Sequence, residues 1–311
     1  MSDTTHFQLS ATDVAAAVSR DPRVRSVAAA TMRGDAFTER TRIIWSSGDF
    51  GRIAVGYAAG AADFVNRLAL NSSDTVLDAA CGTGNLAIPA ARAGATVTGI
   101  DIARNLVDEA REAAQAVGLS IRVDEGDIEA LPYADHSFTT VMSMFGVMFA
   151  AHPERALGEL FRVTQPRGQI ALASWTPTGF IGSVLRAHTA LVPPPAGLPS
   201  ALAWGDPDAV MAMLAPYQSR IRAVQLLRRE ITLSFPISAG GTVELFREFY
   251  GPSVRAYAAL GPADRARLTA DLVNLWSTHN TAGAHETRVR SEYLDVRIEL
   301  KDVVRSGNGS I

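Results

Sequence analysis

The sequence predicts an α/β protein built on a Rossmann-like, doubly wound and mostly parallel sheet, and three features indicate it. Short β-rich runs alternate with helical segments between residues 75 and 174, a rhythm typical of βαβ units. A glycine-bearing turn follows the first run, where doubly wound sheets bind ligands. Later alternation of apolar and polar residues predicts an antiparallel sheet edge. A helical N-terminal appendage and a C-terminal insertion complete the predicted fold.

Each element follows from its local pattern. Parallel strands are expected over the β-rich runs Thr75–Ala79, Thr96–Asp101, Ser120–Glu125, Phe138–Ser143 and Gly168–Ser174. Helices are expected over the segments with helical periodicity, Ala61–Leu70, Asn85–Ala93, Ala103–Val117, Pro153–Val163, Thr242–Tyr257 and Asp264–Trp276. Alternation predicts the two antiparallel strands over Val224–Phe235 and Arg288–Leu300.

Four segments are expected along the chain. Residues 1–45 form the appendage or lid, with a helix over Thr12–Ala30, and residues 46–178 form the ligand-binding core. Residues 179–305 form a substrate cap with the closing strands, and residues 306–311 form a disordered tail. The proline-bearing runs at 193–195 and 204–207 are expected to interrupt any regular element of the cap.

Composition narrows the class of protein. The 29 basic and 32 acidic residues give a net charge of -3 without a Lys/Arg block, which disfavours a nucleic-acid partner. A single cysteine, no leader pattern and no apolar run of about 20 residues predict a cytoplasmic protein that does not span a membrane. No Cys/His cluster has metal-ligand spacing, so no metal is expected.

The glycine turn after the first strand indicates a nucleotide-like ligand. Gly82 and Gly84 allow positive φ and let a ligand approach the backbone closely. Gly82, Gly84 and Ala87 also satisfy the fingerprint in which a helix N-terminus receives a pyrophosphate. A nicotinamide-dependent oxidoreductase therefore stays open as an alternative.

Three acids at successive strand ends sharpen the prediction. Asp78 would repel a pyrophosphate but can attract an ammonium group, which favours a cationic ligand. Asp101 can accept hydrogen bonds from both hydroxyls of a ribose, so it fits a nicotinamide dinucleotide as well as another cofactor that contains a ribose. Asp127 can accept from an adenine amino group, while the amide of Ile128 can donate to a ring nitrogen.

These motifs resemble the class I S-adenosylmethionine-dependent methyltransferases. The family's pattern is similar to residues 77–84, 99–101 and 126–132, and the likeness covers residues 48–175. Ala80 and Arg167 stand where the family usually has glycine. The small Ala80 side chain is expected to leave binding intact.

The resemblance implies S-adenosyl-L-methionine as cofactor. Its methionine part would lie at Asp78 and the glycine loop, its ribose at Asp101 and its adenine at Asp127 and Ile128. The residues expected to contact the cofactor are Asp78, Ala80, Gly82, Thr83, Gly84, Asp101, Ile102, Leu106, Gly126, Asp127, Ile128, Ser143 and Phe145.

The expected reaction is in-line transfer of the sulfonium methyl to a small molecule. The enzyme mainly has to align a nucleophile about 3 Å from the methyl carbon and exclude water. The accepting atom, whether O, N, S or C, stays open. No Asp/Asn-Pro-Pro-Tyr follows the fourth strand, which disfavours methylation of nucleic-acid bases.

Candidate acceptor residues follow from position and type. His152 lies beyond the fourth strand and is the candidate general base, although capping of the helix that begins at Pro153 is the simpler interpretation. The candidate pocket residues are Trp45, Phe50, Tyr57, Met148 and Trp175, for each of which core packing is the alternative.

A third hypothesis is a non-catalytic protein that keeps the cofactor site and binds a partner. The N-terminal appendage motivates it, because extra helices often pair protomers or cover a site. Homodimerisation through this segment is one form of that hypothesis.

Overall fold

The computed structural model describes residues 36–302. The chain divides into two compact units, Met1–Arg40 and Thr41–Ile311. In the first unit the structure describes residues 36–40, which are helical. The predicted helix over Thr12–Ala30 and the predicted tail at 306–311 lie outside the described residues. All that follows concerns the second unit, which begins with the helical residues 41–45.

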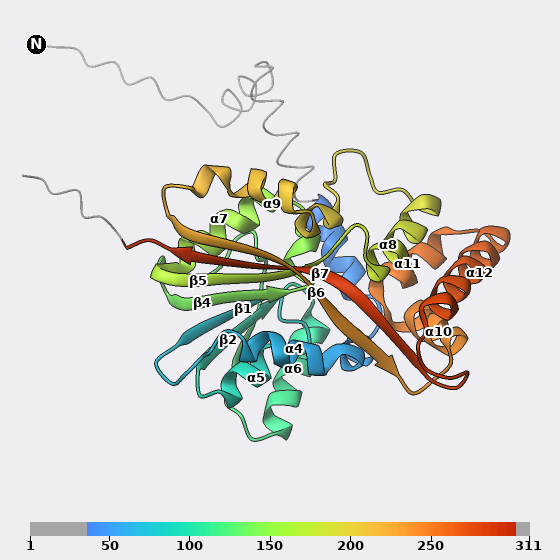
Figure 1. Cartoon of the computed structure of the whole chain (residues 1–311), viewed down its shortest axis with the longest axis horizontal. Coiled ribbons are helices and arrows are strands. Elements are labelled where there is room, and N and C mark those ends of the chain that lie inside the picture. The colour runs from blue at the N-terminus through green and yellow to red at the C-terminus, as the bar shows by residue number, and fades with distance from the viewer. Residues whose placement is uncertain (1–35, 303–311) are drawn as a thin grey trace, which may run out of the picture. The chain divides into compact units, whose positions relative to one another are not determined.

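A seven-stranded sheet in the order β3-β2-β1-β4-β5-β7-β6 forms the centre of this unit (Figure 1). Its strands are β1 Thr75–Ala79, β2 Thr96–Asp101, β3 Arg122–Glu125, β4 Phe138–Met144, β5 Thr164–Trp175, β6 Ile221–Phe235 and β7 Thr287–Leu300. Strands β1 to β5 are parallel, and β7 runs antiparallel to both β5 and β6. The predicted fold class is confirmed.

Helices cover both faces of the parallel strands. They are α4 Ala58–Asn66, α5 Ala87–Arg92, α6 Arg104–Ala116 and α7 Pro153–Val163. The apolar side chains of α6 recur at helical spacing and are buried, namely Leu106, Val107, Ala110 and Ala114. Since the strand order reverses at β1, right-handed crossovers place α5 and α6 on the face opposite α7 (Figure 1).

The helix predicted over Thr242–Tyr257 is wrong, because the chain breaks in its middle. The structure has α10 Ala239–Phe249 and α11 Gly251–Ala259, with Tyr250 in an extended conformation between them. A Cβ atom at Gly251 would collide with the carbonyl oxygen of Ile44, and a proline follows in the first turn of α11. Glycine is therefore required where the chain approaches another segment.

The prediction that residues 204–207 only interrupt regular structure is also wrong. Trp204 and Gly205 end the short helix η3 (Ala201–Gly205), and α9 (Pro207–Leu214) begins directly afterwards. The side chain of Asp206 accepts from the Ala209 amide at 3.0 Å. Proline at the first helical position needs no amide partner, so Pro207 starts this helix.

Two further helices complete the region between β5 and β7. These are α8 Phe180–Leu191 and α12 Pro262–His279, the second of which extends the predicted Asp264–Trp276 at both ends. Trp276 is buried and its ring lies 5.1 Å from that of Phe246 on α10. Aromatic packing therefore joins α12 to α10.

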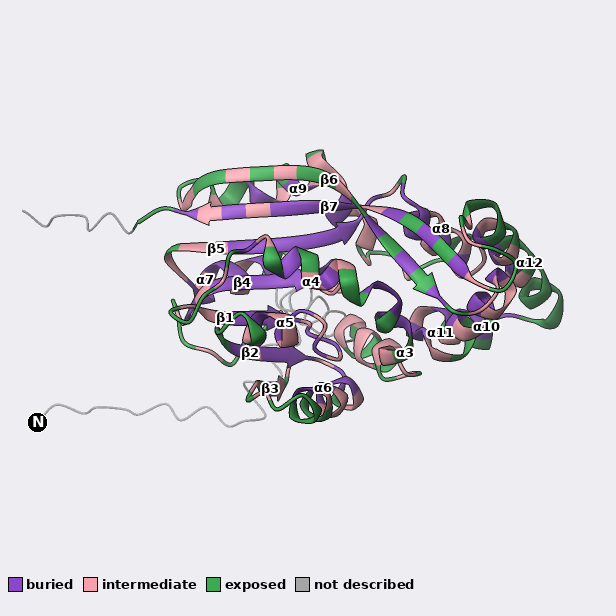
Figure 2. Cartoon of the chain, turned by 60° about the horizontal axis from the view of Figure 1, so that its bottom comes forward, coloured by how far each residue is buried: buried purple, intermediate pink, exposed green. Residues whose placement is uncertain are grey.

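Strand β7 is largely buried, whereas β6 forms an edge with many exposed residues (Figure 2). Asp295 of β7 is 1% exposed and accepts from Arg229 of β6 and from Arg297 at 3.0 and 2.6 Å. Arg67, at the end of α4, lies 3.4 Å from the same carboxylate. One buried charge thus links three segments.

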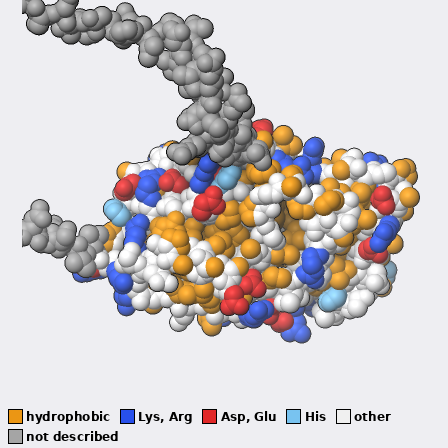
Figure 3. All heavy atoms as spheres, turned by 90° about the horizontal axis from the view of Figure 1, so that it is seen from above, with side chains coloured by type: hydrophobic (Ala, Val, Ile, Leu, Met, Phe, Trp, Pro, Cys, Tyr) orange, Lys and Arg blue, Asp and Glu red, His pale blue; other side chains and the backbone are white. Residues whose placement is uncertain are grey.

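The surface carries mixed charge. On the face drawn in Figure 3, Lys and Arg side chains are interspersed with Asp and Glu, and hydrophobic side chains gather between them. Among residues 36–302, no helix combines the length and the hydropathy needed to cross a membrane.

Candidate functional site

Three acids lie at the carboxyl edge of neighbouring parallel strands. Asp78 is near the end of β1, Asp101 ends β2, and Asp127 follows β3 by two residues. Strand β2 lies between the other two, and the Gly126 amide donates to the Asp101 carbonyl at 2.9 Å. The structure therefore brings together the three carboxylates that the sequence singled out.

Asp78 is a buried carboxyl group, one oxygen of which lacks a hydrogen-bond partner. It is 1% exposed, and its Oδ2 atom has no hydrogen-bond partner among the described residues. Burial raises the pKa of Asp78 to about 8, and the nearby charge of Asp101 adds to this rise. A hydrogen bond from the Ala87 amide opposes it. A cationic group beside Oδ2 would both satisfy this atom and favour its ionised form.

Asp101 organises the loop around it. Its Oδ2 accepts from the Gly82 amide and its Oδ1 from the Ala103 amide, both at 2.9 Å. Burial raises the pKa of Asp101, and these amides oppose the rise. Each carboxylate oxygen keeps a further lone pair, so the side chain can also accept ribose hydroxyls.

The turn after β3 presents one acceptor and one donor. Asp127 is half-buried, and its Oδ1 accepts from the Glu129 amide at 2.9 Å. No acceptor for the Ile128 amide is found within residues 36–302. That amide is free to donate to a ligand, as the adenine assignment requires.

The glycine loop is strained at the residue that departs from the family pattern. Ala80 has φ +57°, in the left-handed region that glycine occupies more readily, as Gly82 (+52°) and Gly84 (+88°) do here. A Cβ atom at Gly146 would lie 2.5 Å from the Ala80 Cβ atom. The Ala80 side chain therefore requires glycine at residue 146.

Ser143 lies next to the last residue of β4 and Phe145 directly follows the strand, beside this loop. Ser143 donates to the Ala79 carbonyl at 2.6 Å and accepts from the Val147 amide at 3.1 Å, so it ties β1 to η2 (Val147–Phe149). Phe145 has φ +59° and stacks on Trp175, with ring centroids 3.5 Å apart. The end of β4 thus joins the acids to an aromatic wall.

Seven rings from separate segments form one contact network, which we call the aromatic cluster: Trp45, Phe50, Tyr57, Phe145, Phe149, Trp175 and Tyr250. Phe50 precedes α3 (Gly51–Ala54) and would contact a Cβ atom placed on Gly82 at 3.7 Å. Tyr57 ends η1 (Val55–Tyr57), and its ring lies 5.6 Å from that of Phe145. The cluster therefore borders the glycine loop.

Two tyrosines of the cluster are buried without using their hydroxyls. Tyr57 is 7% exposed and Tyr250 is 6% exposed, and no hydrogen bond from either hydroxyl is found within residues 36–302. Burial raises the pKa of Tyr57, as do the nearby Tyr250 and Asp78. Both phenols are therefore neutral and can donate to a ligand.

His152 lies at the start of α7 and contacts Glu129. It is the N-cap residue of α7, but its side chain makes no capping bond. Instead, its Nδ1 lies 2.6 Å from Glu129 Oε2, and its backbone amide donates to Glu129 Oε1 at 2.9 Å. The pair anchors α7 to the turn that carries Asp127.

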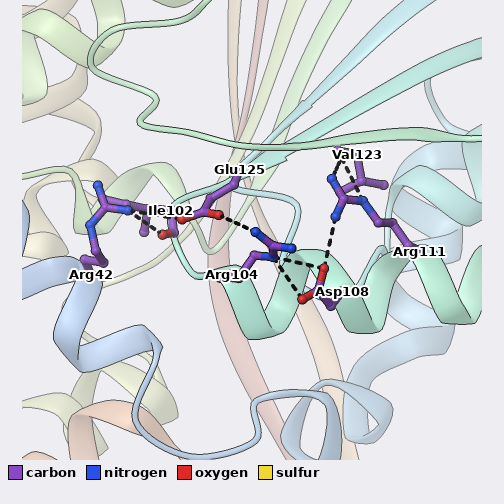
Figure 4. Close-up of polar contacts among 7 residues, drawn as sticks. All are labelled: Arg42, Ile102, Arg104, Asp108, Arg111, Val123 and Glu125. Atoms are coloured by element: carbon purple, nitrogen blue, oxygen red, sulfur yellow. Dashed lines mark hydrogen bonds and ion pairs between the residues drawn. The ribbon is translucent and has the colours of Figure 1, made fainter.

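A basic side chain from residues 41–45 reaches the strand ends. Arg42 donates to the Ile102 carbonyl at 3.0 Å and lies 3.7 Å from Glu125 (Figure 4). Arg104 of α6 lies 3.4 Å from the same carboxylate. Two cations therefore share one acid beside the turn at Asp127.

Known proteins with similar sequences identify the family. Residues 77–172 match the family described as "Methyltransferase domain". The uncharacterised protein Rv1403c of Mycobacterium tuberculosis H37Rv is 35% identical over 232 residues, 74% of this chain and 84% of that protein. A demethylmenaquinone methyltransferase of Thermus thermophilus is 37% identical over 157 residues, 45% of this chain and 71% of that enzyme. The chain belongs to the class I S-adenosylmethionine-dependent methyltransferases. This membership removes support from the nicotinamide alternative.

Solved structures agree with this methyltransferase in fold. A candidate methyltransferase of Bacillus halodurans C-125 has a TM-score of 0.53 at 16% identity and covers 78% of this chain and 98% of its own. The YcgJ protein of Bacillus subtilis has a TM-score of 0.50 at 17% identity, with 77% and 98% covered. At such identity the likeness concerns the fold alone.

The residues of this methyltransferase fit an adenosyl sulfonium. The orphaned Oδ2 of Asp78 suits a cationic amino-acid part, and the Ile128 amide suits a ring nitrogen. Thr83, Ile102 and Gly126 are half-buried along the same edge. Leu106 and Met148 are buried core residues, at 2% and 1% exposure, as core packing would give.

Sequence reasoning missed two residues that lie beside the candidate site. Arg42 contacts a carbonyl 60 residues away, and no local pattern marks such a contact. Glu129 follows Asp127 by two residues, and its proximity to that acid was the only available signal. Both act through segments that the tertiary structure brings together.

Proposed function

We propose that this chain binds S-adenosyl-L-methionine and transfers its methyl group to a planar, neutral small molecule. The observation that carries the proposal is the buried, half-satisfied Asp78 next to Asp101 and Asp127 at one sheet edge. A structural core acid would have both oxygens satisfied, whereas a ligand-binding acid leaves one free.

Each part of the bound cofactor has a proposed partner. When bound, the cofactor supplies an electrophilic methyl group. Asp78 and the amides of the glycine loop hold the methionine part, because the loop backbone is bare at Gly82 and Gly84. Asp101 accepts from the ribose, and Asp127 with Ile128 binds the adenine. Phe145, directly after β4, forms the wall beside the sulfonium.

The aromatic cluster is the proposed acceptor site. Aromatic faces favour a flat molecule and keep water away from the transferred methyl. The cluster itself contains no charged side chain, so a neutral acceptor is favoured. The hydroxyls of Tyr57 and Tyr250 can donate to a polar atom on that acceptor and so set its orientation.

His152 is the proposed base if the acceptor must lose a proton. Glu129 orients the His152 ring, as a general base requires. The contact lies beside the turn at Asp127, however, so it can equally anchor that turn to α7. His152→Asn tests the role. A base predicts lower kcat with Tm retained, whereas an anchor predicts a lower Tm with kcat retained.

Calorimetry with S-adenosylmethionine and S-adenosylhomocysteine tests cofactor binding. Micromolar binding of either supports the proposal, and absence of binding at millimolar concentration would remove it. NADH serves as the control ligand. Incubation with labelled cofactor and a metabolite extract then tests methyl transfer. Demethylmenaquinone is tested as an acceptor as well, because two relatives are named demethylmenaquinone methyltransferase.

The non-catalytic hypothesis makes a different prediction in the same assay. A sensor or partner protein would bind the cofactor but leave every acceptor unlabelled. Light scattering with and without residues 1–40 tests the proposed homodimer, since loss of that segment should halve the mass only if it pairs the protomers.

A further inference from the structure

Arg42 bridges two turns that are distant from it in sequence. Its Nη1 donates to the carbonyl of Ile102, the residue after Asp101, at 3.0 Å. The same atom lies 3.7 Å from Glu125, which ends β3 two residues before Asp127 (Figure 4). Burial raises the pKa of Asp127, and the charge of Arg42 is among the influences that oppose this rise. One guanidinium therefore contacts the residue that follows Asp101 and the strand end that precedes Asp127.

We propose that Arg42 clamps the adenosine end of the cofactor. By joining the turn at Asp101 to the turn at Asp127, the guanidinium holds the two turns around the ligand and slows its release. This inference rests on the proposed function, because it assigns the adenosine to these turns. It makes Arg42 a positioning residue rather than a catalytic one.

The contacts of Arg42 have the strength that a reversible clamp needs. The side chains of Arg42 and Glu125 are 37% and 38% exposed, so solvent screens their ion pair and keeps it weak. The bond to the Ile102 carbonyl is charge-assisted and fixes the direction of the guanidinium. An ion pair of this kind can open and close without unfolding the two turns.

Arg104 provides a natural comparison. It lies 3.4 Å from Glu125 as well, but it belongs to α6 and its other partner is Asp108 on the same helix (Figure 4). Its side chain is 66% exposed. Arg104 therefore shares the charge partner of Arg42 but does not connect the two turns.

The segment that carries Arg42 also reaches the aromatic cluster. Trp45 lies three residues later in the same helical stretch, and its ring is 4.9 Å from Phe149 and 5.9 Å from Tyr250. Residues 41–45 thus contact the turns at Asp101 and Asp127 through Arg42, and the proposed acceptor site through Trp45.

The test compares Arg42→Ala with Arg104→Ala in the full chain, using S-adenosylhomocysteine and adenosine as probes. Arg42→Ala is expected to raise both dissociation constants about tenfold, mostly through faster dissociation in stopped-flow tryptophan fluorescence. Arg104→Ala is expected to change them by less than about twofold. In steady-state kinetics the loss should appear mainly in the KM for the cofactor rather than in kcat, as expected for a positioning residue.

A further pair of variants separates the two ends of the ligand. Asp78→Asn should weaken S-adenosylhomocysteine but not adenosine, which lacks the methionine part, whereas Arg42→Ala weakens both. Arg42→Lys keeps the charge without the planar fork and should fall between Arg42→Ala and wild type. If Arg42→Ala does not fold by circular dichroism, Arg42→Lys against Arg104→Lys decides the same question.

Equal affinities of Arg42→Ala and Arg104→Ala for both probes would overturn the clamp while leaving the proposed function intact. A wild-type protein that binds neither S-adenosylmethionine nor S-adenosylhomocysteine would instead remove the proposed function, and the clamp with it.

Discussion

The proposed cofactor edge, at the carboxyl ends of β1 to β3, and the antiparallel pair of β6 and β7 are held by different kinds of contact. At the proposed cofactor edge, Asp101 accepts from the Gly82 amide, 19 residues away in the sequence. In the β6–β7 pair, whose two strands are separated by three helices, Asp295 contacts Arg67, 228 residues away. The first contact lies within one βαβ unit, whereas the second forms only when the whole sheet has assembled.

The two regions therefore contribute differently to the protein, because one is suited to ligand binding and the other stabilises the fold. The cofactor edge leaves one atom of a buried acid unsatisfied, which favours ligand binding at the expense of stability. In the β6–β7 pair, the buried acid Asp295 instead contacts three arginines, one of them from the end of α4. Substitutions in the two regions should consequently affect different measurements.

The largest effect is expected for Asp295→Asn. It leaves Arg67, Arg229 and Arg297 without their shared carboxylate, so the free energy of unfolding should fall by about 3–5 kcal/mol in chemical denaturation. Glu299→Gln, which removes an exposed partner of Arg222, is the control and should cost about 1 kcal/mol or less. Equal losses for the two variants would contradict the idea that the β6–β7 pair depends on this buried cluster.

Asp101→Ala should act on binding. Loss of its charge-assisted hydrogen bonds is expected to weaken cofactor affinity by about 1.5–3 kcal/mol, measured by calorimetry. Asp108→Ala, an exposed acid one helix turn into α6, is the control. Unchanged affinity for Asp101→Ala would show that the ribose lies elsewhere.

Asp78 should couple binding to pH. Its pKa of about 8 means that the carboxyl is mostly protonated near pH 7, whereas a bound cationic ligand favours the ionised form. Binding should therefore release up to about one proton below pH 8, and affinity should rise with pH until it levels above 8. Calorimetry in buffers of different ionisation enthalpy measures the release, which Asp78→Asn should abolish.

The same raised pKa predicts how the stability of the ligand-free protein depends on pH. Because the folded pKa lies above the ordinary 3.8, the stabilising effect of protonated Asp78 is complete below that value and is lost as pH rises toward 8. Asp78→Asn should thus raise Tm at pH 8 while weakening binding. A lower Tm would mean that Asp78 is a structural acid.

The smallest effect is expected at Arg167. Its φ of +62° suits glycine, so Arg167→Gly should raise the free energy of unfolding by up to about 1 kcal/mol, the strain relieved minus the added chain entropy. Arg167→Ala keeps the strain and loses the exposed pair with Asp302, so it should not stabilise. A gain for both variants would point to the charge rather than the backbone.

Local patterns predicted the core strands well. The bounds of β1 and β2 agree with the predicted runs because short β-rich segments between glycine and polar turns are locally specified. The helices α8 and α9 were not predicted, since prolines near them suggested loops although Pro207 begins α9. The break at Tyr250 depends on Ile44, which lies far away along the chain.

The sequence by itself determined the parallel α/β core, the glycine turn and the acids at Asp78, Asp101 and Asp127, because each belongs to a strand or turn whose conformation is set by its neighbours. Only the tertiary structure decided that Arg42 meets Ile102 and Glu125, and that rings from separate segments form one cluster. Such contacts depend on how whole elements pack, and packing is a property of the closed sheet rather than of any segment.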